Sequence, residues 1–298
     1  MRALAPKELS LSSSDNPQFD PQPMLTSEAN PPVPISPSGS FMASPLPAAL
    51  PTHPPPRDPV WSGWDVLLIA VLTIVSVISL GAMLGLGTYL YQQKSLKEVA
   101  PLLAIVAQAL AYIAVGAFMV MMVQGKYRVP FWQAIRWNWP GGGLRFLGLG
   151  VLTVAVDLLS RYLPMPKTTP FDEFFARPTD AYLMVVFAVS LGPLFEELLF
   201  RGFLYPVLAR RLGVAWGVIL TALPFGLMHY MQYRSWSAVL LIFIVGVVLT
   251  VVRAVTNSVA ASFLVHVGYN GTLMLLAATA TGGFRHMEKL GTLQFYLR

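Results

Sequence analysis

The chain has 298 residues, of which 55% are hydrophobic and 11% are charged. Soluble globular domains carry about 25% charged residues, so this composition excludes an ordinary soluble protein. The net charge is +6, but most Lys and Arg residues lie in short segments between apolar runs, which fits a lipid bilayer as partner rather than nucleic acid. The absence of cysteine excludes a thiol nucleophile, a cysteine metal ligand and a disulfide.

Residues 1–60 differ in composition from the rest of the chain. They hold 15 of the 25 prolines, many serines and no long apolar run. Such a segment cannot bury enough apolar surface to offset its ordering entropy, so we predict a disordered Pro/Ser-rich tail. It also lacks the basic stretch and apolar core of a signal peptide. After it we expect N-terminal transmembrane helices and interfacial segments over 61–180, a core over 181–280 and a C-terminal tail over 281–298.

Seven apolar segments follow the tail, each long enough or nearly long enough to cross the apolar layer of a bilayer, which takes about 20 residues. They lie near residues 64–91, 99–123, 144–163, 181–204, 212–229, 235–253 and 258–280. In lipid every backbone N–H and C=O must be satisfied within the protein, and the segments lack the period-two alternation of a barrel. The sequence therefore predicts an all-α fold, a polytopic transmembrane bundle of seven to eight helices.

Two shorter stretches predict structure at the membrane surface. Residues 130–139 carry several Trp, Phe and Ile side chains and favour an interfacial amphipathic segment. Residues 172–175, Asp-Glu-Phe-Phe, favour a second short surface helix.

The fourth apolar segment contains three ionisable residues, Glu196, Glu197 and Arg201. Each costs about 2.5–3.5 kcal/mol at membrane depth, so such residues are rare and usually functional. Glu197 and Arg201 are four apart, share one helix face and stand in the favourable order for an ion pair. Glu196 points roughly 100° away around the helix. We therefore expect Glu197 to neutralise Arg201 and Glu196 to remain available, with a break at Pro193 widening the space around it.

Two later segments supply further polar groups. Phe225 and His229 are four residues apart, and His266 and Asn270 have the same spacing. Hydrolysis of an amide needs a base that activates water and donors that stabilise the oxyanion. A carboxylate, two imidazoles and an amide could supply both. Taken singly, each His could be a packing residue and the Glu–Arg pair a structural clamp, but their joint occurrence favours one shared polar chamber.

Other charged residues in the apolar segments predict structural roles. Asp157 and Arg161 lie four apart near the end of the third segment, which favours an interfacial ion pair. Arg234 and Arg253 are interpreted as loop residues or as long side chains that reach the membrane surface.

These motifs resemble a known family. Glu-Glu-x-x-x-Arg (196–201), Phe-x-x-x-His (225–229) and His-x-x-x-Asn (266–270), in this order, resemble the CAAX-protease and bacteriocin-processing (CPBP, or abortive-infection) family of intramembrane endopeptidases. The resemblance covers about residues 181–280 and implies a catalytic core there, within a bundle of about eight helices with a conical cavity. It implies that Glu196 activates water with the help of His229. It also implies an oxyanion site at His266 and Asn270, with structural support from Glu197, Arg201 and Phe225.

Two mechanisms are open at this level. In the first, Glu196 and His229 polarise water without a metal. In the second, Glu196, His229 and His266 bind zinc, a chemically reasonable ligand set. The chain lacks a compact His-Glu-x-x-His element and Asn270 is a poor zinc ligand, so we favour the metal-free route with no cofactor.

Three classes of function compete for the same residues. We favour an intramembrane endopeptidase acting on a peptide or membrane protein, in an integral multi-pass protein of the bacterial cytoplasmic membrane. The first alternative is a non-catalytic scaffold or immunity protein that uses the same cavity. The second is a transporter or proton relay, which the lack of an internal repeat disfavours.

Overall fold

The computed structural model describes residues 58–92, 96–287 and 289. The predictions for the Pro/Ser-rich tail and for most of the C-terminal tail therefore lie outside the described residues. Residues 55–298 form one compact unit, which contains everything described below. Within the described ranges the chain forms helices and no strand, so the predicted all-α class is confirmed.

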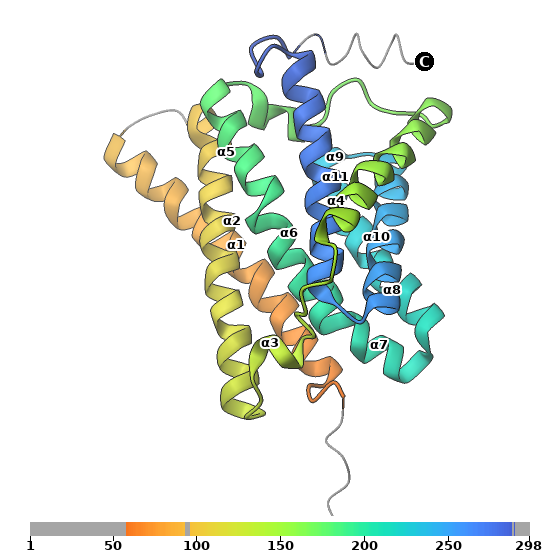
Figure 1. Ribbon diagram of the computed structural model, residues 1–298. Coiled ribbons are helices and arrows are strands. Elements are labelled where there is room, and N and C mark those ends of the chain that lie inside the picture. The colour runs from red at the N-terminus through yellow and green to blue at the C-terminus, as the bar shows by residue number, and fades with distance from the viewer. Residues whose placement is uncertain (1–57, 93–95, 288, 290–298) are drawn as a thin grey trace, which may run out of the picture. The chain divides into compact units, whose positions relative to one another are not determined.

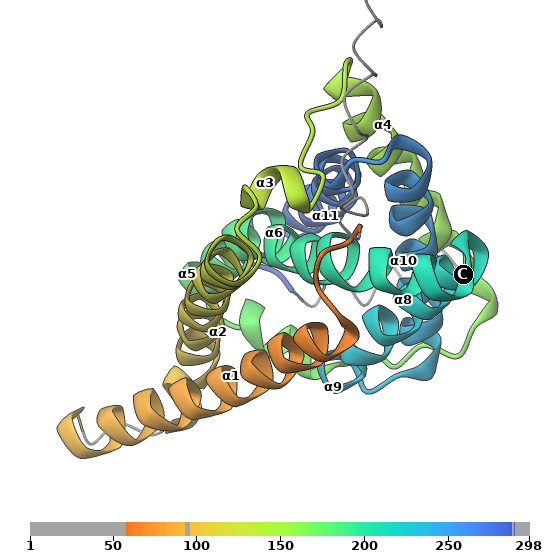
Figure 2. The same cartoon turned by 90° about the horizontal axis from the view of Figure 1, so that it is seen from below.

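The helices follow one another with short connections (Figure 1). In chain order they are α1 (Gly63–Gln92), α2 (Leu96–Met121), the π-helix η1 (Met122–Lys126), α3 (Phe131–Ala134), α4 (Gly143–Thr153), the 3-10 helices η2 (Val154–Tyr162) and η3 (Pro170–Phe175), α5 (Pro178–Val189), α6 (Leu191–Glu196), the π-helix η4 (Glu197–Leu204), α7 (Tyr205–Leu212), α8 (Val214–Met228), α9 (Tyr230–Tyr233), α10 (Trp236–Thr256) and α11 (Val259–Ala280). Seen along the helices in Figure 2, α11 lies between α4, α6 and α10.

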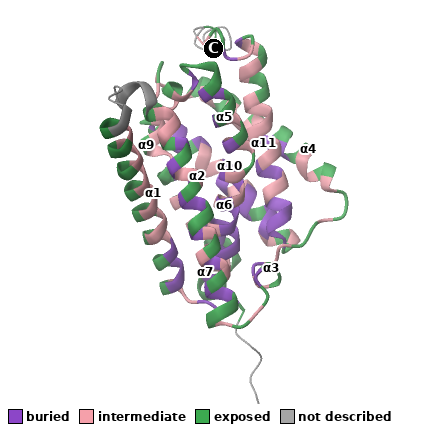
Figure 3. Cartoon of the chain, turned by 90° about the vertical axis from the view of Figure 1, so that its left-hand side faces the viewer, coloured by how far each residue is buried: buried purple, intermediate pink, exposed green. Residues whose placement is uncertain are grey.

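Seven stretches of the described chain are long and apolar enough to span a membrane. They are Gly63–Leu90, Ala100–Lys126, Gly143–Tyr162, Pro178–Leu212, Val214–Tyr233, Trp236–Thr256 and Val259–Ala280. Their order matches the seven predicted segments, and their limits differ from the prediction by at most eight residues. Large apolar side chains remain exposed along α1, whose buried residues lie at its N-terminal end (Figure 3). The chain is therefore a multi-pass membrane protein.

The fourth span is broken where Pro193 predicts a break. Pro193 has no N–H to bond the carbonyl of Val189, and α5 ends at Val189. Ser190 follows with non-helical dihedral angles (φ −123°, ψ −85°), and α6 begins at Leu191. The helix then widens into η4, with i to i+5 bonding of the kind that is frequent at functional sites. The first motif therefore lies on irregular helix between a kink and a π-helix.

Both predicted surface segments are short and amphipathic. In the first, Phe131 and Ile135 are buried whereas Trp132 and Trp139 are exposed. The second is η3, which extends slightly beyond the predicted limits; its Phe175 is buried.

The predicted Asp157–Arg161 ion pair is wrong. Both residues lie in η2, a 3-10 helix with three residues per turn, so residues four apart do not share a face. Arg161 is exposed. Asp157 instead accepts a hydrogen bond from the hydroxyl of Tyr269 on α11, with an oxygen–oxygen distance of 3.2 Å.

Trp61, just before α1, anchors this end of the described chain to the fourth span. Its side chain is 1% exposed, and its indole Nε1 donates to the carbonyl oxygen of Phe203 at 3.0 Å. The Trp61 and Phe203 rings stack with their centroids 4.5 Å apart. The entry to α1 is therefore fixed on the helical segment that carries the first motif.

Two glycines bring α4 and α11 into backbone contact. A Cβ atom added to Gly150 would lie 2.2 Å from the carbonyl oxygen of Val265, and one added to Gly268 would lie 2.4 Å from the carbonyl oxygen of Leu147. Small residues permit this close approach between membrane helices. Because α11 carries His266 and Asn270, the contact fixes the position of both.

We expect Gly268→Ala to reduce the yield of folded protein strongly, because the added methyl group must push two backbones apart. Size-exclusion chromatography of detergent-extracted protein and its thermal aggregation temperature measure the effect. Gly148→Ala on α4 is the matched control, since nothing lies within 4 Å of the added atom. Equal yields for the two variants would contradict the predicted contact.

Candidate active site

Glu197 and Arg201 form an ion pair that is fully buried in the protein. Both side chains are 0% exposed, and Arg201 Nη1 lies 2.9 Å from Glu197 Oε1. The rest of the guanidinium donates into α10, from Nη2 to the carbonyl of Gly246 at 3.0 Å and from Nε to Thr250 Oγ1 at 3.3 Å. A buried charge pair is tolerated only when its remaining donors and acceptors are also satisfied. The structure thus brings together the pair expected from the sequence.

Glu197 also holds α11, a role that the sequence analysis missed. Ser262 Oγ donates to Glu197 Oε2 at 2.5 Å, and His266 Nδ1 lies 2.9 Å from Glu197 Oε1. A carboxylate can only accept hydrogen bonds, so Nδ1 of His266 carries the proton. In the neutral ring Nε2 is then an acceptor. One carboxylate therefore fixes both the orientation and the tautomer of His266.

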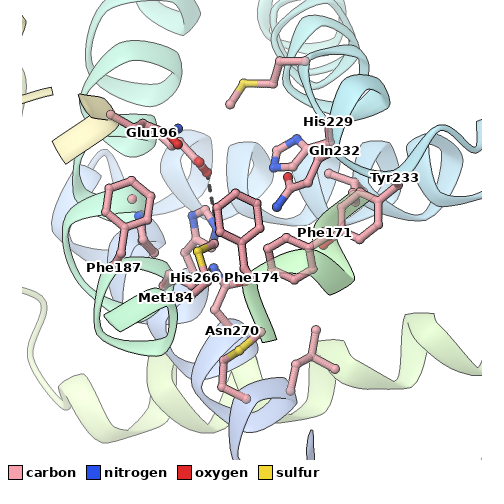
Figure 4. Close-up of a pocket in the computed structure, with 18 of the residues that line it drawn as sticks. Phe171, Phe174, Met184, Phe187, Glu196, His229, Gln232, Tyr233, His266 and Asn270 are labelled. Atoms are coloured by element: carbon pink, nitrogen blue, oxygen red, sulfur yellow. Dashed lines mark hydrogen bonds and ion pairs between the residues drawn. The ribbon is translucent and has the colours of Figure 1, made fainter. Parts of the chain in front are cut away.

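Glu196 occupies a different environment from its neighbour. Its side chain is 13% exposed and lines the cavity, whereas Glu197 is completely enclosed. Glu196 Oε2 lies 3.7 Å from His266 Nε2 (Figure 4). The available carboxylate and the first imidazole thus face each other across a gap longer than a hydrogen bond.

His229 lies at the C-terminal end of α8 and also lines the cavity. Its Nδ1 is 2.8 Å from the carbonyl oxygen of Phe225, so Nδ1 donates and Nε2 remains an acceptor for the cavity. The Phe225 ring lies between the two imidazoles, with centroid distances of 5.2 Å to His229 and 5.8 Å to His266. The Arg201 guanidinium carbon lies 4.3 Å from the same ring. Phe225 thus joins the ion pair to both imidazoles.

Asn270 makes a bond that its spacing did not predict. Its Nδ2 donates to the carbonyl oxygen of Ala188 at 2.8 Å. Ala188 belongs to the last turn of α5, whose carbonyls have no partner within their own helix. Asn270 therefore caps the break above Pro193 and keeps a second N–H on the same nitrogen. The predicted oxyanion role of Asn270 depends on that second N–H.

Five of the motif residues line a cavity of about 430 Å³: Glu196, Phe225, His229, His266 and Asn270. Its wall is largely apolar, with Phe171 and Phe174 from η3 and Met184 and Phe187 from α5 (Figure 4). Its polar side chains are those of Gln108, Glu196, His229, Gln232, Tyr233, His266, Tyr269 and Asn270. The sequence analysis named four of these eight. The others carry no charge and belong to no motif, but Gln232 follows His229 by only three residues, which is the spacing of neighbours on a helix.

Arg253 is buried in the protein, so the prediction of a loop residue or of a long side chain reaching out to the membrane surface is wrong. The residue is 4% exposed, and its Nε donates to the carbonyl oxygen of Arg201 at 3.2 Å. Its Nη1 donates to Asn257 Oδ1 at 2.8 Å. These acceptors satisfy the guanidinium inside the bundle. Arg234 is exposed in the turn between α9 and α10, as predicted.

The zinc ligands weighed above do not form a metal site in this arrangement. Among the described residues, no group of three or more His, Cys, Asp or Glu side chains lies close enough to hold a metal ion. His266 Nδ1 is engaged by Glu197, and His229 Nδ1 by a backbone carbonyl. Both imidazoles keep Nε2 open towards the cavity, so these hydrogen bonds do not decide between the two mechanisms, and the metal-free route stays a prediction.

Comparison with known proteins found a family that matches the part of the chain carrying the three motifs. Residues 178–272 match the model of the Rce1-like family, described as type II CAAX prenyl endopeptidase Rce1-like. The resemblance to CAAX proteases is confirmed over this segment. It covers about one third of the chain and contains all three motifs. No curated protein and no solved structure matched the chain.

We expect Glu197→Gln to lower the folded yield strongly, because the change leaves the Arg201 charge buried without its counter-charge. Breaking a buried pair in this way costs about 3–5 kcal/mol. The yield of monodisperse protein after detergent extraction measures it. Glu173→Gln, at an exposed position, is the control. A normal yield and thermal stability for Glu197→Gln would contradict the structural role of the pair.

Proposed function

We propose that this protein is an intramembrane endopeptidase that hydrolyses peptide bonds with Glu196 as the general base. The observation that carries the proposal is Glu196, the one carboxylate among the described residues that line the cavity, which faces His266 Nε2 while His229 lines the same cavity. The family match over the same residues supports a protease of the CAAX type.

In the proposed reaction, Glu196 removes a proton from a water molecule as the water oxygen bonds to the scissile carbonyl carbon. The carbonyl π electrons move to oxygen and form an oxyanion. When the C=O bond reforms, the C–N bond breaks and the leaving nitrogen takes up a proton. His229 presents Nε2 as an acceptor that helps to orient the water. One peptide and one water thus give one acid and one amine.

The oxyanion roles proposed for His266 and Asn270 differ in their proton sources. Asn270 donates through its second N–H, since the first is bound to Ala188. His266 donates from Nε2 only as the imidazolium, which forms when it takes a proton from protonated Glu196, 3.7 Å away. The same proton can then pass to the leaving amine. His266 is thereby both an electrostatic stabiliser and a proton carrier.

The proposed substrate is a membrane-associated protein or peptide, because the cavity lies among membrane-spanning helices and its wall is largely apolar. The proposed location is the cytoplasmic membrane of a bacterium, where maturation of a peptide or cleavage of a membrane protein suits this site. The family description refers to a prenyl endopeptidase, so the assays below test a prenylated peptide separately from an unprenylated one.

We expect Glu196→Gln to abolish cleavage and leave the folded yield normal, because the side chain supports no other part of the fold. The measurement is mass spectrometry of peptides released in membranes that contain the wild type, the variant or neither. Identical peptide profiles for the wild type and Glu196→Gln would show that Glu196 is not the general base. Full rescue of a deletion phenotype by a Glu196→Ala, His229→Ala double variant would instead support the scaffold function.

We expect a strong chelator to leave cleavage intact, because the proposed route assigns no step to a metal. Purified enzyme is incubated with the chelator, passed through a desalting column and assayed against the untreated enzyme. Loss of cleavage on chelation, followed by recovery on addition of zinc, would overturn the metal-free route.

A further inference from the structure

The polar side chains that line the cavity divide into those with a hydrogen-bond partner and those without one. Gln108 Nε2 donates to the hydroxyl of Tyr112 at 2.8 Å, Tyr269 donates to Asp157, and Asn270 donates to Ala188. Both histidines use Nδ1 as described above. Within the described chain, the side chains of Gln232 and Tyr233 have no hydrogen bond. These two are therefore free to bind a substrate.

The backbone holds Gln232 next to His229. Gln232 N donates to the carbonyl oxygen of His229 at 3.0 Å, which places both residues in one turn at the start of α9. Figure 4 shows the Gln232 amide beside the imidazole and directed into the cavity. A primary amide carries two N–H donors and one carbonyl acceptor. An amide donor thus stands next to the catalytic imidazole without a partner.

The site has a surplus of acceptors and few donors. Glu196 offers carboxylate oxygens, and each neutral imidazole offers Nε2 as an acceptor, because its Nδ1 proton is used elsewhere. Asn270 keeps one free N–H. Stabilising an oxyanion requires donors that are already oriented. Before the water attacks, the motif residues offer only the free N–H of Asn270, because His266 donates from Nε2 only after it takes a proton from Glu196. The free amide of Gln232 supplies donors that are in place before any proton moves.

We propose that Gln232 is a further catalytic residue, which donates from Nε2 to the scissile carbonyl oxygen of the substrate. This inference rests on the proposed endopeptidase function. As the water oxygen bonds to the carbonyl carbon, the negative charge develops on the oxygen that faces the amide. Gln232 keeps its protons throughout and only its hydrogen bond shortens. Tyr233 packs against the ring of Phe171, with centroids 5.4 Å apart, and belongs to the cavity wall.

The test compares purified variants in proteoliposomes. The probes are a fluorogenic peptide that ends in a farnesylated cysteine and three aliphatic residues, and its unprenylated counterpart. Gln232→Met keeps the side-chain length and removes the amide, and Gln232→Glu keeps the shape but has no N–H. Tyr230→Phe is the control on the same helix, because Tyr230 packs against Trp236 and does not line the cavity. Folded yield, kcat and KM are measured for each protein.

We expect both Gln232 variants to lose about 100- to 1000-fold in kcat, the usual effect of removing one oxyanion donor, with KM within about threefold. Their folded yield should equal that of Tyr230→Phe, which a purely structural role for Gln232 would not give. A wild-type kcat in Gln232→Met overturns the inference. If a Tyr233→Phe variant, measured in the same way, loses activity instead, the role passes to Tyr233. If the wild type and Glu196→Gln cleave neither probe more than empty vesicles do, and the membrane peptide profiles also agree, the proposed function fails and this inference with it.

Discussion

The charges of Glu197 and Arg201 are buried in the bundle, so they must neutralise each other and find hydrogen-bond partners inside the protein. Their partners come from α10 and α11 as well as from η4, so the same contacts join three helices. In a hydrocarbon environment the alternative to these bonds is an unsatisfied charge. The pair therefore acts as an assembly point. The orientation of His266 follows from it, because the ring bonds to a carboxylate oxygen whose position is already fixed.

The part of the site around Glu196 depends on the break between α5 and α6. The helix α5 ends before Pro193, and Asn270 from α11 satisfies the carbonyl of Ala188 in its last turn. Immediately after the break, Glu196 enters the cavity while Glu197 turns towards Arg201. In an unbroken helix the carbonyl of Ala188 would bond within the helix, and it would not be available to Asn270. The irregular backbone therefore positions Glu196, and the bond from Asn270 to Ala188 ties this part of the chain to α11, which also carries His266.

The sequence predicted those features that follow from hydropathy and helical spacing. The seven spans, the Glu197–Arg201 pair and the break at Pro193 each depend on local pattern. Contacts between distant segments were not predictable in this way. The bonds from Glu197 to Ser262 and from Asn270 to Ala188 depend on which helices are neighbours. Arg253 was placed wrongly because an apolar sequence does not reveal that its guanidinium reaches a backbone carbonyl on another helix. Asp157 was paired wrongly because hydropathy does not distinguish a 3-10 turn from an α turn.

The contact between Trp61 and Phe203 sets a practical boundary for work on the proline-rich part of the chain. A deletion that stops before Trp61 keeps an indole over the ring of Phe203 and a donor on its carbonyl. A deletion that includes Trp61 uncovers both within a few residues of Arg201. Loss of activity in the longer deletion would therefore report damage to the helical segment that carries the first motif, whereas the shorter deletion isolates what the tail itself contributes.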